Sequence, residues 1–319
     1  MAGSNTRTRI LVLGANGQVG HALHGVLAPL GEVVVATRDG RLVDGRAAAA
    51  IDLEDSAALV GGLDAVAADV IVNAAAWTAV DRAEDEPERA DRINHRAVGE
   101  IGGWAQRRGA LVIHYSTDYV FDGTARRPYR EQDPTAPLGA YGRSKRDGEE
   151  ALRASGAAHV ILRTAWVYGP RGGNFLCTML RLAGERDRLR VVADQIGSPT
   201  PAPWIADITA RILAHWCGLA GAERASVEGT YHLTTASHTS WHGFAESILR
   251  GALRRGLITR MPVVEAIPAA EYPTRARRPA WSVLDTGKLA LVFGLHLPTW
   301  ERGLDAVLDE LARNRGETG

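Results

Sequence analysis

Short apolar runs alternate with amphipathic segments along the first half of the chain. The runs have the length and β-branched content of buried strands and cover residues 9–13, 32–37, 69–76, 111–118 and 159–169. Between them, apolar residues recur at helical spacing, which predicts helices at about 19–30, 56–67 and 87–108. Strands that alternate with helices predict an α/β fold with a doubly wound parallel sheet, covered by helices on both faces.

Beyond residue 170 this alternation loosens. Proline and glycine gather at 197–203 and 272–281, and a last amphipathic helix is expected at about 299–313. We therefore predict a Rossmann-like domain over residues 1–170 and a smaller lobe over residues 171–319 that is interleaved with the sheet domain.

Composition narrows the class of protein. The chain has 319 residues, with 37 Lys and Arg against 37 Asp and Glu, so it offers no net charge to attract nucleic acid or an anionic membrane. No apolar run approaches the roughly 20 residues that cross a bilayer. The two cysteines, Cys177 and Cys217, provide neither a disulfide framework nor metal-ligand spacing. We expect a cytoplasmic protein without a metal site.

Three glycines, Gly14, Gly17 and Gly20, lie between the first strand and the first helix. Gly17 lets backbone N–H groups approach a pyrophosphate, Gly20 allows close packing, and the helix N-terminus favours negative charge. The spacing is GxxGxxG rather than GxGxxG, so the loop alone is weak support. With a strand before it and a helix after it, the loop predicts dinucleotide binding.

The end of the second strand bears on the choice of cofactor, because an acid there holds the ribose hydroxyls and repels a 2′-phosphate. This strand ends in Thr37 and Arg38, and a cation suits the phosphate. NADPH is therefore favoured, NADH stays open, and a surface arginine in a loop is the structural alternative. Asp52 can accept from the adenine amino group or cap the following helix.

Tyr141 and Lys145 are four residues apart and therefore share a helix face. A cation about 4 Å from a phenol lowers the phenol pKa from its usual value of about 10, which gives a proton donor tuned toward neutral pH. Ser116, Thr117 and Asp118 end the strand at 111–118, where doubly wound sheets bind ligands. Thr117 is expected to bond a substrate carbonyl and Tyr141, whereas Ser116 is equally typical of a turn.

The chain resembles the dTDP-4-dehydrorhamnose reductase family of extended short-chain dehydrogenases/reductases in motifs that occur in this order: GANGQVG, NAAAWT, YSTDYVFDG, YGRSK, RTAWVYG, NFLCTMLRLA and DQIGSPT. The similarity continues through GTYHLTTA, YPTRARRP and WERGLDAVLDEL and so covers nearly the whole chain. The resemblance implies NAD(P)H-dependent reduction of the 4-keto group of a dTDP-6-deoxy-L-hexose, giving dTDP-L-rhamnose or a close analogue.

The resemblance also implies residue roles. Thr117, Tyr141 and Lys145 are expected to be catalytic, and the sugar is expected to touch Thr117, Asp118 and Trp166. The implied cofactor contacts are Gly17, Gln18, Val19, Thr37, Asp52, Leu53, Ala76, Trp77, Thr78, Tyr115, Tyr141 and Lys145.

A sugar nucleotide needs cations at its pyrophosphate and an apolar wall at its hexose. Trp166 is expected to pack on the hexose, with Asn174 and Phe175 beside it. Three arginines cluster in the proline-broken segment, and at least one of them, with Arg277 as our choice, is expected to meet the nucleotide; the others are Arg275 and Arg278. A solvated basic turn is the alternative for any single arginine.

Some members of this family bridge a dimer through magnesium held by three glutamates. The matching positions here are Ala22, Pro203 and Glu310, so only one of the three is an acid. The metal is therefore not carried over, and a homodimer is left open.

Two other functions compete with reduction. Related nucleotide-sugar dehydratases carry Thr-Asp-Glu at this strand end, whereas this chain has Thr117, Asp118 and Tyr119 and lacks that acid. A noncatalytic NADP-binding regulatory subunit, similar to that of methionine adenosyltransferase, can keep much of the same site. The motifs do not separate this module from an enzyme, and a turnover assay does.

Overall fold

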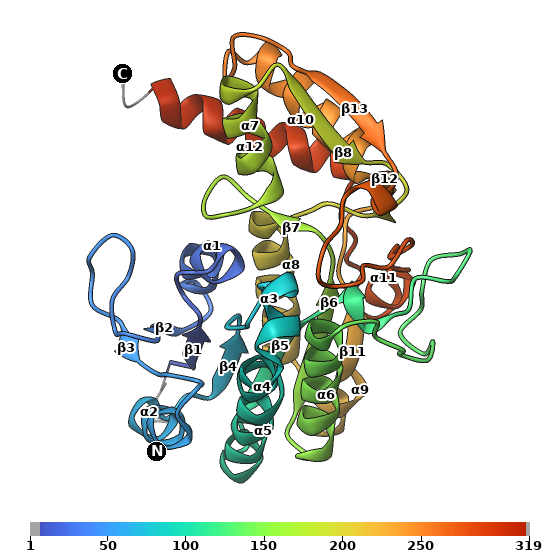
Figure 1. Ribbon diagram of the computed structural model, residues 1–319. Coiled ribbons are helices and arrows are strands. Elements are labelled where there is room, and N and C mark those ends of the chain that lie inside the picture. The colour runs from blue at the N-terminus through green and yellow to red at the C-terminus, as the bar shows by residue number, and fades with distance from the viewer. Residues whose placement is uncertain (1–6, 317–319) are drawn as a thin grey trace.

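The computed structural model describes residues 7–316 and has a seven-stranded sheet in its lower half (Figure 1). Its strand order is β11-β6-β5-β4-β1-β2-β3, and all of its pairings are parallel. The bounds are β1 Arg9–Leu13, β2 Glu32–Thr37, β3 Ala49–Ala50, β4 Val70–Asn73, β5 Leu111–Thr117, β6 His159–Thr164 and β11 Gly229–His232. The predicted doubly wound parallel sheet is confirmed.

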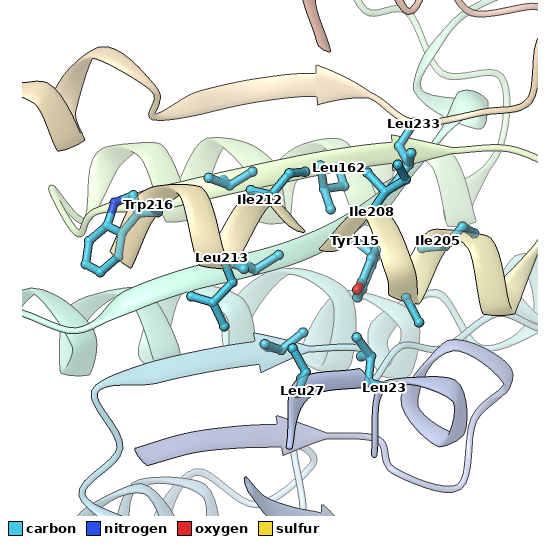
Figure 2. Packing of buried hydrophobic residues seen from close by; sticks show 14 of the residues in the cluster. Leu23, Leu27, Tyr115, Leu162, Ile205, Ile208, Ile212, Leu213, Trp216 and Leu233 are labelled. Atoms are coloured by element: carbon cyan, nitrogen blue, oxygen red, sulfur yellow. The ribbon is translucent and has the colours of Figure 1, made fainter. Parts of the chain in front are cut away.

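Helices cover both faces of the sheet because alternate strand residues point to opposite sides. Ile10 and Val12 of β1 join a core under α1 (Gln18–Leu27) and α8 (Ala202–Gly218). These two helices lie on the same face of the sheet, and Figure 2 shows their apolar side chains facing one another there. Leu11 and Leu13 join the opposite core, under helices with the bounds α2 Ser56–Val66, α5 Ala97–Arg108 and α6 Ala140–Ala154.

The segment expected to be one helix at 87–108 is divided. It consists of α4 (Pro87–Asp91), a π-helical turn (Arg92–Arg96) and α5, and an unexpected helix α3 (Val80–Asp85) precedes it. A π-turn inserts one residue into the helical repeat and so turns a side chain inward that a regular helix would place elsewhere. Asn94 lies in this turn and is 1% exposed.

The later part of the chain forms a lobe above the sheet (Figure 1). Its apolar core lies between three helices and a parallel pair of strands: α7 Phe175–Glu185, α10 Trp241–Arg254, α12 Trp300–Gly316, β8 Arg188–Val192 and β13 Val263–Ile267. However, α8 and β11 return to the sheet domain, as does α11 (Gly287–Phe293), whose Leu289 joins the core beneath α8. The domain division at residue 170 stays a prediction.

The run expected as one strand at 159–169 is interrupted between β6 and β7 (Val167–Tyr168). Trp166 stands at the break with a φ of 46°, a conformation that an aromatic residue rarely adopts. β7 then leaves the sheet and pairs with β10 (Thr200–Pro201), while β9 (Ile196–Gly197) pairs with β12 (Thr239–Ser240). The short helix α9 (Ala222–Ser226) precedes β11. Across residues 7–316, no helix combines the length and apolar character needed to cross a membrane.

Candidate active site

The glycine loop makes a tight turn between β1 and α1. Gly14 has a φ of 76°, and a Cβ there would lie 2.6 Å from the backbone nitrogen of Ala75. A Cβ on Gly20 would lie 2.1 Å from the Gly14 carbonyl oxygen, so close packing excludes a side chain there too. Gly17 precedes α1, which has no side-chain cap, so its first N–H groups are free to bind an anion.

A cavity of about 370 Å³ opens beside this loop, at the carboxyl ends of β1, β2 and β4. This edge is where doubly wound sheets bind their ligands. Seven predicted cofactor residues line it: Gly14, Gly17, Thr37, Arg38, Asp52, Leu53 and Ala76. The cavity also includes residues that we did not predict, among them Asn16, Asp39, Glu54 and Ile93.

Carboxylates surround Arg38 at the adenosine end of this cavity. The Arg38 guanidinium, with 68% of its side chain exposed, lies 3.6 Å from the Glu54 carboxylate. Asp39 accepts from the Thr37 hydroxyl at 3.1 Å, and this bond lowers the pKa of Asp39. Asp52 accepts from the Glu54 N–H, whereas Asp55 caps α2, so the structure assigns that cap to Asp55 and leaves Asp52 at the cavity.

Other predicted cofactor residues lie deeper or further out. Val19 packs against the core, and the Gln18 side chain accepts a hydrogen bond from Asn174 at 3.0 Å. The Trp77 ring contacts the guanidinium groups of Arg82 and Arg89, whose central carbons lie 4.9 and 4.8 Å from the ring centroid, and Thr78 is exposed. None of these four predicted residues lines the 370 Å³ cavity.

Asn94 is a buried residue that the sequence reasoning missed. Its side chain accepts from the Trp77 N–H at 2.9 Å and donates to the Trp77 carbonyl at 3.0 Å. It also donates to the Ser144 hydroxyl of α6 at 3.1 Å. Asn94 therefore fixes the loop after β4 against α6, and the only signal for it is an asparagine inside an amphipathic helical pattern.

Thr117 and Asp118 lie at the end of β5, as predicted. The Thr117 hydroxyl donates to Asp118 Oδ1 at 3.0 Å and accepts from the Tyr119 N–H at 3.1 Å. Asp118 is 2% exposed, and its Oδ2 has no hydrogen-bond partner within the described part of the chain. Burial raises the pKa of Asp118 to about 6.

Tyr141 and Lys145 both turn toward β5 from the first turns of α6. Burial raises the pKa of Tyr141 to about 12, with the Thr117 hydroxyl acting in the opposite direction. Tyr119 meets the Tyr141 ring edge-on, with 5.8 Å between the ring centroids. The expectation that Lys145 lowers the Tyr141 pKa is wrong for this arrangement, because burial of the phenol dominates.

Lys145 is 2% exposed and is held by β5. Its Nζ donates to the Tyr115 carbonyl at 2.6 Å and lies 3.2 Å from Nε2 of His114. Burial lowers the Lys145 pKa to about 8, although the carboxylate of Glu149 favours the charged form. The lysine is thus brought into the range where it exchanges protons near neutral pH.

The predicted cofactor contact of Tyr115 stays a prediction, and its side chain points into the core. Its phenol lies in the core beneath α8, where Figure 2 shows it beside Ile205 and Ile208, and it shares a hydrogen bond of 2.8 Å with the Thr209 hydroxyl. Strand alternation causes this, since Tyr115 points to the α8 face while His114 points toward α6. Only the Tyr115 carbonyl reaches Lys145.

In the second lobe, Trp166 stacks on Trp241 with 3.5 Å between ring centroids and 5° between planes. Gly197 makes room for it, because a Cβ there would lie 2.5 Å from the Trp166 ring. Trp241, which the sequence reasoning missed, also contacts Phe175. The stack forms an apolar wall with one indole face already covered.

The side chain of Asn174, a predicted sugar contact, is engaged by other parts of the protein. It caps α7 by accepting from the Cys177 N–H at 3.0 Å, and it donates to Gln18 and to the Gly169 carbonyl at 3.0 and 2.9 Å. Asn174 therefore joins the lobe to the glycine loop, and its contact with the sugar stays a prediction.

The three clustered arginines differ in their partners. Arg275 pairs with Asp85 and Arg278 with Asp81, the latter at 2.8 Å. Arg277 is exposed and lines a cavity of about 280 Å³ with Tyr272 and Gln195 among its neighbours; it also lines a small hollow that reaches Tyr119 and Tyr141. Of the three, Arg277 is placed between the second-lobe cavity and the reacting end.

A glycine cradle at the sheet edge, together with a tyrosine and a lysine one helical turn apart facing the end of β5, defines an extended short-chain dehydrogenase/reductase. Its fold is shared with the UDP-glucose 4-epimerase of Thermus thermophilus in complex with NAD, with a TM-score of 0.75 at 19% identity and coverage of 96% and 99% of the two chains. The family model described as the RmlD substrate binding domain matches residues 8–313, and the chain belongs to this family.

Individual relatives agree with this assignment. The dTDP-4-dehydrorhamnose reductase of Burkholderia thailandensis is 46% identical over 310 residues, which cover 95% of this chain and 99% of the relative. The enzyme of the same name from Escherichia coli is 42% identical over 302 residues, with coverage of 95% and 97%. The crystal structure of dTDP-4-dehydrorhamnose reductase from Bacillus anthracis in complex with NADP has a TM-score of 0.83 at 32% identity, with coverage of 95% and 99%.

Proposed function

We propose that this chain is an NADPH-dependent dTDP-4-dehydrorhamnose reductase, which reduces the 4-keto group of a dTDP-4-dehydro-6-deoxy-L-hexose to an alcohol. The observation that carries the proposal is the meeting of Tyr141, Thr117 and Lys145 at the end of β5, next to the glycine cradle. The relatives' names support the same reaction.

The residues of the glycine loop fit a dinucleotide. Gly14 and Gly20 leave backbone where a Cβ would collide, and the uncapped start of α1 offers N–H groups to a pyrophosphate. Thr37, Asp52 and Leu53 would hold the adenosine, and Lys145 would lie at the nicotinamide ribose. When bound, the reduced nicotinamide supplies the hydride that C4 of the sugar accepts.

Tyr141 is the proton donor in this proposal. As C4 gains the hydride, its carbonyl oxygen becomes an oxyanion and takes the phenolic proton of Tyr141, and the C4–OH group results. The Thr117 hydroxyl polarises the carbonyl and orients the phenol. Because burial raises the pKa of Tyr141 to about 12, the phenol holds its proton at neutral pH until the oxyanion forms.

The second lobe would hold the rest of the substrate. Asp118 has a buried carboxylate oxygen without a hydrogen-bond partner among the described residues, and this oxygen can accept from a sugar hydroxyl. Trp166, which is half-buried, would contribute its stack with Trp241 to the apolar wall beside the hexose. Among residues 7–316, Arg277 has no carboxylate partner of the kind that holds Arg275 and Arg278, and it would meet the pyrophosphate.

NADPH is the proposed cofactor, and NADH is expected to be accepted as well. Arg38 suits a 2′-phosphate, and a relative at 32% identity was solved with NADP. However, Asp39, Asp52 and Glu54 line the same cavity and would repel that phosphate.

The proposal places the reaction in the cytoplasm, which suits two free thiols, Cys177 and Cys217. A homodimer is not required by the mechanism, because Thr117, Tyr141 and Lys145 come from one chain. Sedimentation of the purified protein measures the oligomeric state directly.

Turnover tests the proposal. The purified chain, without any partner protein, is expected to oxidise NADPH when dTDP-4-dehydrorhamnose is added and to form dTDP-L-rhamnose, identified by NMR. Tight NADP binding with no product would instead support the noncatalytic regulatory module and refute the proposal.

A further inference from the structure

Two buried polar side chains, Asn73 and His114, lie beneath the reacting end, lead to Lys145 and have no part in the mechanism so far. Asn73 ends β4, His114 lies opposite it on β5, and Lys145 reaches them from α6. Their exposed fractions are 1%, 0% and 2%. Asn73 Nδ2 lies 3.2 Å from His114 Nδ1, and His114 Nε2 lies 3.2 Å from Lys145 Nζ.

The donors and acceptors around Asn73, His114 and Lys145 determine which of the histidine nitrogens carries the proton. The Ala75 N–H donates to Asn73 Oδ1 at 3.2 Å, so Asn73 Nδ2 faces His114 and donates to Nδ1. A neutral imidazole whose Nδ1 accepts carries its proton on Nε2. Complete burial holds the His114 pKa well below its usual value, so the ring is neutral.

The Nε2–H of His114 then points at Lys145 and needs an acceptor. An ammonium group has three donors and no lone pair, whereas a neutral amine can accept from Nε2–H and still donate to the Tyr115 carbonyl. The arrangement therefore satisfies every group when the lysine is neutral. Glu149, one turn further along α6, favours the charged amine, but Arg163 of β6 binds both of its oxygens, at 2.9 and 2.7 Å.

We propose that His114 is a positioning residue that donates to Lys145 and favours its neutral amine, with Asn73 fixing the histidine tautomer. The inference rests on the proposed function, because it assumes that Lys145 works beside Tyr141. When Lys145 takes up a proton, the hydrogen bond between Lys145 and His114 reverses its direction. The Lys145 ammonium donates, His114 Nε2 accepts, and the ring proton moves to Nδ1. The Asn73 amide must then rotate and release the Ala75 N–H.

This rearrangement links the lysine charge to the cofactor cavity. Ala75, whose N–H is released, lines that cavity together with Ala74 and Ala76. A bound anionic cofactor favours a cation at Lys145, and so binding of the cofactor and uptake of the proton support each other. In this way His114, which touches neither ligand, adjusts the protonation of a catalytic residue.

The ¹⁵N spectrum of histidine tautomers tests the proposal on the intact, cofactor-free chain. We expect His114 to carry its proton on Nε2 at pH 9 and on Nδ1 when the pH falls well below 8, with a midpoint that reports Lys145. His159 is an internal control, since its Nδ1 lies 2.8 Å from the Ala157 carbonyl and its tautomer should stay constant.

Two variants sharpen the test. Asn73→Asp places a carboxylate at His114 Nδ1, so the Nδ1–H tautomer should persist to a pH at least about one unit higher. Lys145→Met removes the titrating partner, so the pH dependence of the His114 signal should disappear even if Asn73→Asp does not fold. A His114 proton on Nδ1 at every pH, or a midpoint that survives Lys145→Met, would overturn the proposal. Because no turnover is measured, failure of the reductase assay leaves these outcomes intact.

Discussion

The two ends of the candidate site are built in different ways. At the reacting end, Thr117, Asp118 and Lys145 are 6%, 2% and 2% exposed, and hydrogen bonds from β5 fix them. At the adenosine end, the Arg38 side chain is 68% exposed, and its closest carboxylate is 3.6 Å away. The groups that move protons are buried, and the group that would read the cofactor phosphate is in solvent.

Because of this difference in burial, substitutions at the two ends should affect different properties of the protein. Burial strengthens electrostatic effects and shifts pKa values, as Asp118, Tyr141 and Lys145 illustrate. An exposed arginine is screened by water and salt, so its effect on binding is small. We therefore expect large effects on rate and stability at the reacting end, and smaller effects on affinity at the nucleotide ends.

The largest effect is expected for Tyr141→Phe. Loss of the positioned proton donor should lower kcat by about 10² to 10⁴, with NADPH affinity largely kept. Tyr119→Phe is the matched control, because its ring lies against Tyr141 and its phenol has no assigned role. Steady-state kinetics of both variants decides: near-normal turnover by Tyr141→Phe would remove Tyr141 from the proposed role.

Asp118→Asn should make the protein more stable while impairing sugar binding. The Asp118 pKa is about 6 in the folded chain against an ordinary value of 3.8, so the folded state binds this proton more tightly. The wild type therefore loses stability as the pH rises from about 4 to 6. Asparagine has no such charge, and at pH 7 the variant should gain roughly 1 to 3 kcal/mol in the free energy of unfolding.

Urea denaturation of both proteins between pH 4 and 7 measures this difference. Asp133→Asn is the control of opposite sign, because a hydrogen bond from Arg127 lowers the pKa of Asp133 to about 2, and its charge is stabilising above the unfolded pKa. If the free energy of unfolding of Asp118→Asn depends on pH in the same way as that of the wild type, burial does not destabilise the charged form of Asp118.

Arg277→Ala tests the nucleotide end of the sugar. Loss of one charge-assisted bond to a pyrophosphate is worth about 1.5 to 3 kcal/mol, so KM for the sugar nucleotide should rise roughly tenfold or more, and less at high salt. Arg275→Ala is the matched control, since Asp85 already pairs with that arginine. A change in NADPH affinity with an unchanged KM for the sugar nucleotide would show that Arg277 contacts the cofactor, not the sugar nucleotide.

The smallest effect is expected at Arg38. Arg38→Ala should weaken NADPH about fivefold and leave NADH unchanged, because an exposed ion pair contributes up to about 1 kcal/mol. Glu54→Gln should act in the opposite direction, since it frees Arg38 from its carboxylate and removes a charge that repels the phosphate. Titrations with both cofactors check this, and equal weakening of NADPH and NADH by Arg38→Ala would contradict it.

The strands at 9–13 and 32–37 could be predicted to the residue, because strands buried on both faces leave continuous apolar runs in the sequence. Spacing alone also predicted that Tyr141 and Lys145 share a face of α6. Strand alternation would have separated Tyr115 from His114, had it been applied within 111–118. In contrast, no local pattern indicates the stack of Trp166 on Trp241, since their partnership depends on how the lobe folds.

The return of the chain to the sheet has a consequence for biosynthesis. β11 covers the outer edge of β6, and α8 covers the apolar face beside α1, yet both follow residue 200. While a ribosome has released only the first 170 residues, β6 has an unpaired edge and that face is open to other nascent chains. The core of the nucleotide-binding fold is therefore finished only after α11 has emerged, so chaperone protection matters most in the interval between these two points.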